Sequence, residues 1–196
     1  PSVGHLGVYI GLRGTAAELG LPKTNYWIYP GNDSDAALDR YLADPSSEFP
    51  VVYLSFPSAK DPDFERRHPG KATIEIVAPV PYEPFAAWAG KTWGKRGEDY
   101  EALKKAYGER LLAHLFDKVP QARRHIDYWE VSTPLSMQWF CGWQRGELYG
   151  LDHDPARMRA RWLRPRTKVP GLWLTGQDIM SCGVSGARSK PAPPVA

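Results

Sequence analysis

Thr73-Ile74-Glu75-Ile76-Val77-Ala78 alternates in polarity with a period of two, as a half-buried β-strand does. An earlier run, Val51-Val52-Tyr53-Leu54-Ser55-Phe56, is apolar almost throughout and predicts a strand that is buried on both sides. The segment 58–70 between them is polar and contains two prolines, so we predict a loop there. We expect the two strands to lie side by side, and this pair sets the fold class.

Outward from this pair, the sequence predicts strands over 5–12, 25–29 and 125–131. Asp33 or Ser34 can cap a short helix in which Ala37, Leu38, Tyr41 and Leu42 share one face. Because strands come in pairs, with helices between the pairs rather than after each strand, the pattern favours an α+β fold with a mixed or antiparallel sheet.

The longest helix is predicted over 98–119, where apolar residues recur every three or four positions before Pro120. Beyond the strand at 125–131, Ser132 or Thr133 can cap a short helix that has Pro134 in its first turn. A brief helix is expected over 155–162 and a last buried strand over 171–176.

The composition is that of a globular chain: of 196 residues, 42% are hydrophobic and 24% are charged, which excludes disorder of the whole chain. No run of about 18 apolar residues predicts a spanning helix. Cys141 and Cys182 are too few for a disulfide framework or a four-cysteine zinc site, and we expect two unpaired thiols in a reducing, cytoplasmic compartment. The histidines have no metal-ligand spacing, so no metal site is expected. His153 is read as part of a capped turn.

Six basic residues and no acidic one lie between Arg157 and Lys168, although the net charge of the chain is only +3. Such a cluster suits phosphates, an acidic partner or an anionic membrane surface, and it equally suits a solvated face. No recognised nucleic-acid motif accompanies it, so nucleic acid is not an expected partner.

The candidate site is a glycine-punctuated turn that follows the last predicted strand. Gly176-Gln177-Asp178 ends the strand, and small residues from 181 to 187 can open a helix. Free backbone N–H groups at such a turn suit an electron-rich group such as a phosphate or a flavin carbonyl. The alternative is a tight surface turn in which Asp178 only caps a helix.

The turn also carries a family resemblance. Leu174-Thr175-Gly176-Gln177-Asp178, followed by Gly183-Val184-Ser185-Gly186-Ala187, resembles the C-terminal flavin-binding segment of the retinol saturase family. That family belongs to the phytoene desaturase and carotenoid isomerase group of FAD-dependent oxidoreductases. The segments 132–136, 146–154 and 163–172 resemble the same family.

The resemblance implies a division of the chain and a set of cofactor contacts. Residues 1–131 would be a substrate-binding domain, residues 132–188 a return segment to the FAD-binding domain, and residues 189–196 a disordered tail. The chain would be the C-terminal part of the enzyme, and the N-terminal dinucleotide-binding half would be its missing partner. The residues that would contact FAD are Gly176, Gln177, Asp178, Gly183, Val184, Gly186 and Ala187.

The implied activity is FAD-dependent saturation, desaturation or isomerisation of carbon–carbon double bonds in retinoid- or carotenoid-like isoprenoids, with NAD(P)H as candidate electron donor. The apolar substrate leaves room for peripheral membrane contact. No catalytic side chain is assigned, and the chain alone is expected to be inactive. Trp139, Phe140 and Trp143 are expected to pack in the core; with the resemblance, some of them, or Trp27 or Trp88, would border a polyene tunnel. The alternative function is a non-catalytic binding module for an apolar ligand or a partner protein.

Overall fold

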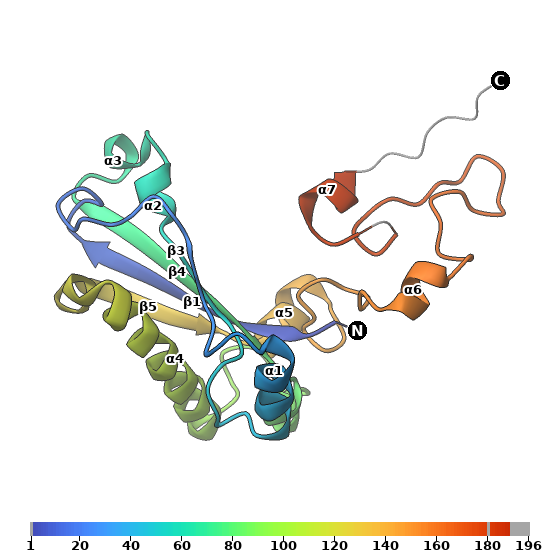
Figure 1. The fold of residues 1–196 in the computed structure, drawn as a ribbon, viewed down its shortest axis with the longest axis horizontal. Helices are drawn as coiled ribbons and strands as arrows, with labels where there is room; N and C mark the ends of the chain where they lie inside the picture. The colour runs from blue at the N-terminus through green and yellow to red at the C-terminus, as the bar shows by residue number, and fades with distance from the viewer. Residues whose placement is uncertain (1, 180, 189–196) are drawn as a thin grey trace.

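The computed structural model describes residues 2–179 and 181–188, and its centre is one five-stranded sheet (Figure 1). The strand order is β2-β3-β4-β1-β5, and every neighbouring pair is antiparallel. The strands are β1 (Gly4–Arg13), β2 (Tyr26–Ile28), β3 (Val52–Ser55), β4 (Lys71–Val80) and β5 (Ile126–Ser132). The α+β prediction is confirmed, and so is the pairing of β3 with β4.

Helices fill the connections. They are α1 (Ser34–Ala43), α2 (Pro57–Lys60), α3 (Phe64–Arg67), α4 (Glu98–Lys118), α5 (Pro134–Cys141), α6 (Pro155–Arg159) and α7 (Gly183–Arg188), with 3-10 turns η1 (Glu83–Trp88) and η2 (Pro120–Arg124). Asp33 caps α1, and Thr133 begins α5 with a capping box. The predicted loop over 58–70 is wrong in part, because it holds α3 and most of α2. Pro57 supplies a preformed first turn for α2.

Helix α4 covers one face of the sheet (Figure 1). Its buried residues include Leu111 and Leu115. Gly108 lets the helix approach β5 closely, since a Cβ at this position would clash with the Trp129 ring. The core therefore lies between α4 and the strand residues that alternate toward it, such as Val8 and Ile76.

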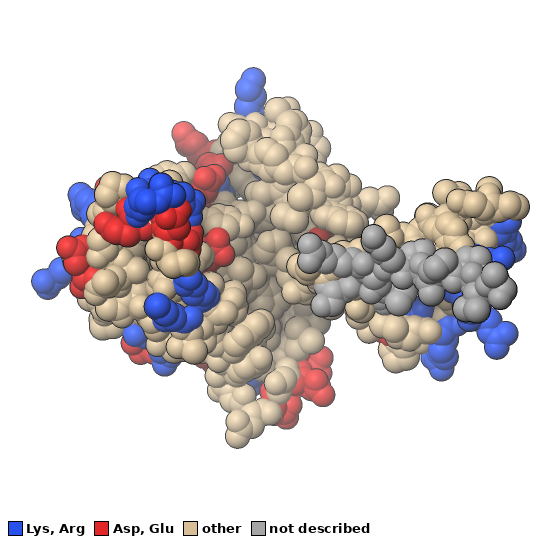
Figure 2. Space-filling view, turned by 90° about the horizontal axis from the view of Figure 1, so that it is seen from above, with Lys and Arg blue, Asp and Glu red and all other residues tan. Residues whose placement is uncertain are grey.

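The opposite face of the sheet is largely open. Strand residues that alternate away from α4 include Tyr9, Trp27, Tyr53 and Tyr128, and three of these four are exposed. Helix α2 covers only one end of this face, where the backbone N–H of Thr73 donates to Ser58 Oγ. Seen from above, charged side chains gather over α2 and α3, and the middle of the molecule carries few of them (Figure 2).

The chain from about 145 onward projects from the end of the sheet at which β1 begins (Figure 1). The predicted strand over 171–176 is wrong: its only ladder contact among the described residues is an isolated bridge between Arg166 and Trp173. A strand needs a row of partner groups along one edge. Without that row Leu172 stays 49% exposed. The predicted tail 189–196 lies outside the described residues.

The expected core packing of Trp139 and Phe140 is also wrong, since they are 51% and 66% exposed. Helix α5 buries its first residues, Pro134 and Leu135, against the sheet, so its last turn points away. There Phe140 meets Trp93 edge to face, with ring centroids 5.4 Å apart.

Candidate functional site

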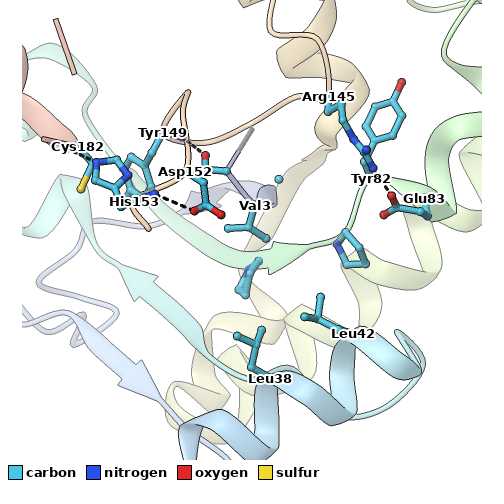
Figure 3. A pocket seen from close by; sticks show the side chains of 14 residues that line it. Val3, Leu38, Leu42, Tyr82, Glu83, Arg145, Tyr149, Asp152, His153 and Cys182 are labelled. Carbon is cyan, nitrogen blue, oxygen red and sulfur yellow. Dashed lines mark hydrogen bonds and ion pairs between the residues drawn. The ribbon is translucent and has the colours of Figure 1, made fainter. Parts of the chain in front are cut away.

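A cavity lies where the projecting segment meets the end of the sheet (Figure 3). Its volume is about 720 Å³, within the range of small-molecule sites. Residues from both ends of the chain line it: Ser2, Val3, Gly4, Leu38, Leu42, Pro79, Pro81, Tyr82, Glu83, Arg145, Tyr149, Asp152, His153 and Cys182.

One wall of the cavity is apolar. Leu38 and Leu42 point into it from α1 (Figure 3). Pro79 of β4 and Pro81, just beyond the strand, also line it. The prediction put both leucines on one helix face with Ala37 and Tyr41. Only Ala37 and Tyr41 are buried, because they face the core while the leucines lie on the cavity side. The two leucines are thus free to contact a ligand.

The opposite rim is polar. Arg145 forms an ion pair with Glu83, and its guanidinium lies 5.3 Å from the centre of the Tyr82 ring. The backbone N–H of Arg145 donates to Glu147, whose side chain is buried. This arrangement fixes a cation at the rim, where it can orient the polar end of a mostly apolar ligand.

Residues 148–151 bring the projecting segment against the first residues of the chain. The Ser2 N–H donates to the Gly150 carbonyl at 2.7 Å, and the Leu148 N–H donates to the Val3 carbonyl at 3.0 Å. The Tyr149 N–H donates to Ser2 Oγ. The cavity therefore depends on hydrogen bonds between segments about 145 residues apart.

The glycine-punctuated turn lies beside the cavity and is held to the same segment. Asp178 Oδ1 accepts from the Leu151 N–H at 2.8 Å, and Arg157 donates to the Gln177 carbonyl at 2.7 Å. The Cys182 N–H donates to Nε2 of His153 at 2.7 Å. Asp178 does not cap α7, which begins five residues later, so the helix-cap alternative is wrong.

The seven residues predicted to contact FAD lie in this turn and in α7, and none of them lines the cavity itself. Gly176 and Gly183 have φ values of +124° and +82°, and a Cβ on either would meet no atom within 4 Å. Val184 is 70% exposed. The backbone of both glycines is therefore open on the side where a Cβ would lie.

Gly186 and Ala187 have a different setting. A Cβ on Gly186 would clash with the Ser181 carbonyl, so this glycine serves the close return of the chain. The Ala187 carbonyl accepts from the Thr175 hydroxyl at 3.4 Å. Their predicted contact with FAD stays a prediction.

The sequence analysis missed most of the cavity. Asp154 caps α6, as the capped-turn interpretation of this segment expects, but the neighbouring His153 also lines the cavity. The sequence held one signal for Leu38 and Leu42: the helix has more apolar residues than one buried face, formed by Ala37 and Tyr41, can use. Within the basic cluster Arg157 is half-buried and holds the turn, so it is not a solvated charge.

Comparison with known proteins agrees with the motifs. The human protein named all-trans-retinol 13,14-reductase is 39% identical over 194 residues, which cover 95% of this chain and 32% of the relative. The Rattus norvegicus protein of the same name is 37% identical over the same shares. A Danio rerio protein named inactive all-trans-retinol 13,14-reductase is 33% identical over 201 residues, again with 95% and 32% coverage. No family model matches the chain.

The chain is thus similar over nearly its whole length to proteins named retinol 13,14-reductases, as its motifs indicate. It spans about a third of the length of the curated relatives that it matches.

Proposed function

We propose that this chain forms the substrate cavity and part of the flavin site of an FAD-dependent reductase that saturates a carbon–carbon double bond of a retinoid. The observation that carries the proposal is an apolar cavity directly beside the glycine-punctuated turn, in a chain 39% identical to a retinol 13,14-reductase. Saturating one double bond adds two electrons and two protons to the substrate, and NAD(P)H is the proposed source of the electrons.

The chain's own part is binding and orientation. Leu38, Leu42 and Pro79 offer an apolar wall for the polyene, and burial of apolar surface supplies the affinity. Arg145, paired with Glu83, is placed to receive the hydroxyl end. The cavity would also keep water from the reacting carbons.

In this proposal the turn holds FAD, and bound FAD would supply the redox chemistry. Gly176 and Gly183 support this through their open backbone faces. Asp178 is half-buried, its Oδ1 accepts from the Leu151 N–H, and Oδ2 is the proposed acceptor for a cofactor hydroxyl. The exposed Leu172 and Leu174 would be covered by the dinucleotide-binding segment, the proposed partner.

The test measures all-trans-retinol binding by ligand fluorescence, and FAD uptake by absorbance after desalting. Leu42→Asp places a charge in the apolar wall at an exposed helix position and should weaken retinol binding at least tenfold. Ala113→Asp, at an exposed position of α4 away from the cavity, is the matched control. Equal retinol affinities for the two variants would refute the cavity assignment.

A non-catalytic apolar-binding module is the second candidate, and the inactive Danio rerio relative favours considering it. The two differ in one measurement. With FAD, NADPH and the dinucleotide-binding segment present, a reductase consumes the polyene absorbance of retinol. A binding module holds retinol and leaves that absorbance unchanged.

A further inference from the structure

An apolar strip of strand side chains runs across the uncovered face of the sheet from Pro79, which lines the cavity. Pro79 lines the cavity and lies on β4, two residues from Val77 on the same side of the strand. Val77 is directly opposite Tyr53 of β3, and Tyr53 is directly opposite Trp27 of β2. These four side chains form one row from the cavity to the edge of the sheet. We call this row the apolar strip.

The strip is partly exposed and long enough to extend the cavity. The rings of Trp27 and Tyr53 lie against each other at an angle of 51°, with centroids 4.6 Å apart. Pro79, Val77 and Tyr53 are half-buried, and Trp27 is 60% exposed. From β4 to β2 the row crosses two strand spacings, which adds roughly 10 Å of apolar path to the cavity.

Polar neighbours confine the strip along one side. The next row across the same face carries Ser55, Glu75 and Tyr9, followed by Glu130. Burial and the nearby Glu75 carboxylate raise the pKa of Tyr9, so its hydroxyl stays protonated at neutral pH. The strip itself carries no charge. An uncharged, slender hydrocarbon chain matches a strip bordered in this way, because it needs no partner from the neighbouring Glu75 or from Glu130, whose carboxylate already accepts from the Tyr128 hydroxyl.

We infer that the apolar strip is the outer half of the ligand site, and that Trp27 and Tyr53 bind the far end of a long isoprenoid whose other end lies in the cavity. This inference rests on the proposed function and deepens it. It makes Trp27 and Tyr53 determinants of ligand length: a ligand that fits within the cavity does not reach them, and a longer one gains their contact.

The test compares two probes on the full chain: all-trans-retinol, and geraniol, which keeps an allylic hydroxyl end but has a much shorter isoprenoid chain and no ring. Trp27→Ala and Tyr53→Ala should each weaken retinol binding roughly three- to tenfold, the worth of one aromatic contact. The affinity for geraniol, measured by displacement of a fluorescent ligand, should change less than twofold. Tyr128→Ala, an exposed aromatic of the same face outside the strip, is the control.

Equal effects of the strip variants on both probes, or no effect on retinol, would overturn the inference and leave the cavity assignment standing. Failure of the unmodified chain to bind either probe would overturn both proposals. Sedimentation of the same variants tests whether the strip binds a second copy of the chain instead of a ligand. Loss of a dimer in Trp27→Ala, with retinol binding intact, would assign the strip to self-association instead.

Discussion

Replacing Asp178 separates two roles that its carboxylate can have. In the structure Oδ1 accepts from the Leu151 N–H at 2.8 Å and ties the turn to the cavity segment. A hydrogen bond to a charged group contributes about 1.5–3 kcal/mol, and for this half-buried side chain the lower end applies. If this tether to Leu151 were the only role of the carboxylate, Asp178→Ala would lower the melting temperature by roughly 3–6 °C, at about 2–4 °C per kcal/mol for a chain of this size.

The proposed flavin contact adds a second loss. Asp178→Ala would then weaken FAD retention about 10- to 100-fold, because a charge-assisted hydrogen bond to the cofactor disappears as well. Asp178→Asn is the matched variant: its amide oxygen can still accept from Leu151, so the fold is kept while the charge is lost.

The assay measures bound FAD by absorbance after desalting, with the dinucleotide-binding segment present, and melting by circular dichroism. We expect Asp178→Asn to melt like the unmodified chain and to lose FAD retention severalfold. Undiminished flavin in Asp178→Ala, together with a lowered melting temperature, would show that the carboxylate is a tether alone and would refute the cofactor role.

Three other predictions concern the frame around the site. Gly108→Ala should lower the free energy of unfolding by about 1–2 kcal/mol in urea, because overpacking against Trp129 outweighs the gain in helix propensity of about 1 kcal/mol. The control Ala113→Gly, at an exposed position of the same helix, should lose only the helix propensity of about 1 kcal/mol. Burial lowers the pKa of His5 below its usual 6.5. The unfolded chain therefore binds a proton more readily than the folded chain, and the free energy of unfolding should fall as the pH drops through and below about 6.5. In urea unfolding at pH 7.5 and 5.5, His5→Gln should lose less stability between the two pH values than the unmodified chain does. Thr133→Ala should lower the free energy of unfolding by about 2 kcal/mol, since it removes the α5 cap. It also removes the Thr133 hydroxyl that lies 2.7 Å from the buried Tyr100 hydroxyl. A variant as stable as the unmodified chain would contradict this.

Local signals predicted most of the sheet and its helices. β4 alternates because one of its faces is covered by α4, and Asp33 and Thr133 begin helices because their side chains accept from backbone N–H groups three residues ahead. Each of these causes lies within a few residues of its effect. The strand expected over 171–176 lacked such a cause. Its apolar residues match those of β3, but β3 has a partner strand on each side, whereas 171–176 forms a single bridge with the part of the chain that the structure describes.

The cavity was beyond local reasoning for a physical reason, which is that it is assembled from contacts distant in sequence. The first residues of the chain fix 148–151 through backbone hydrogen bonds, and that segment in turn holds Asp178. His153 holds Cys182 from the same side. The motif at 174–187 could therefore indicate a family and a cofactor, while the wall facing it came from α1 and β4, whose sequences carry no such motif. A ligand bound in the cavity would contact both ends of the chain at once, so its affinity should depend on the pairing of residues 2–4 with 147–150 as well as on the cavity's own side chains.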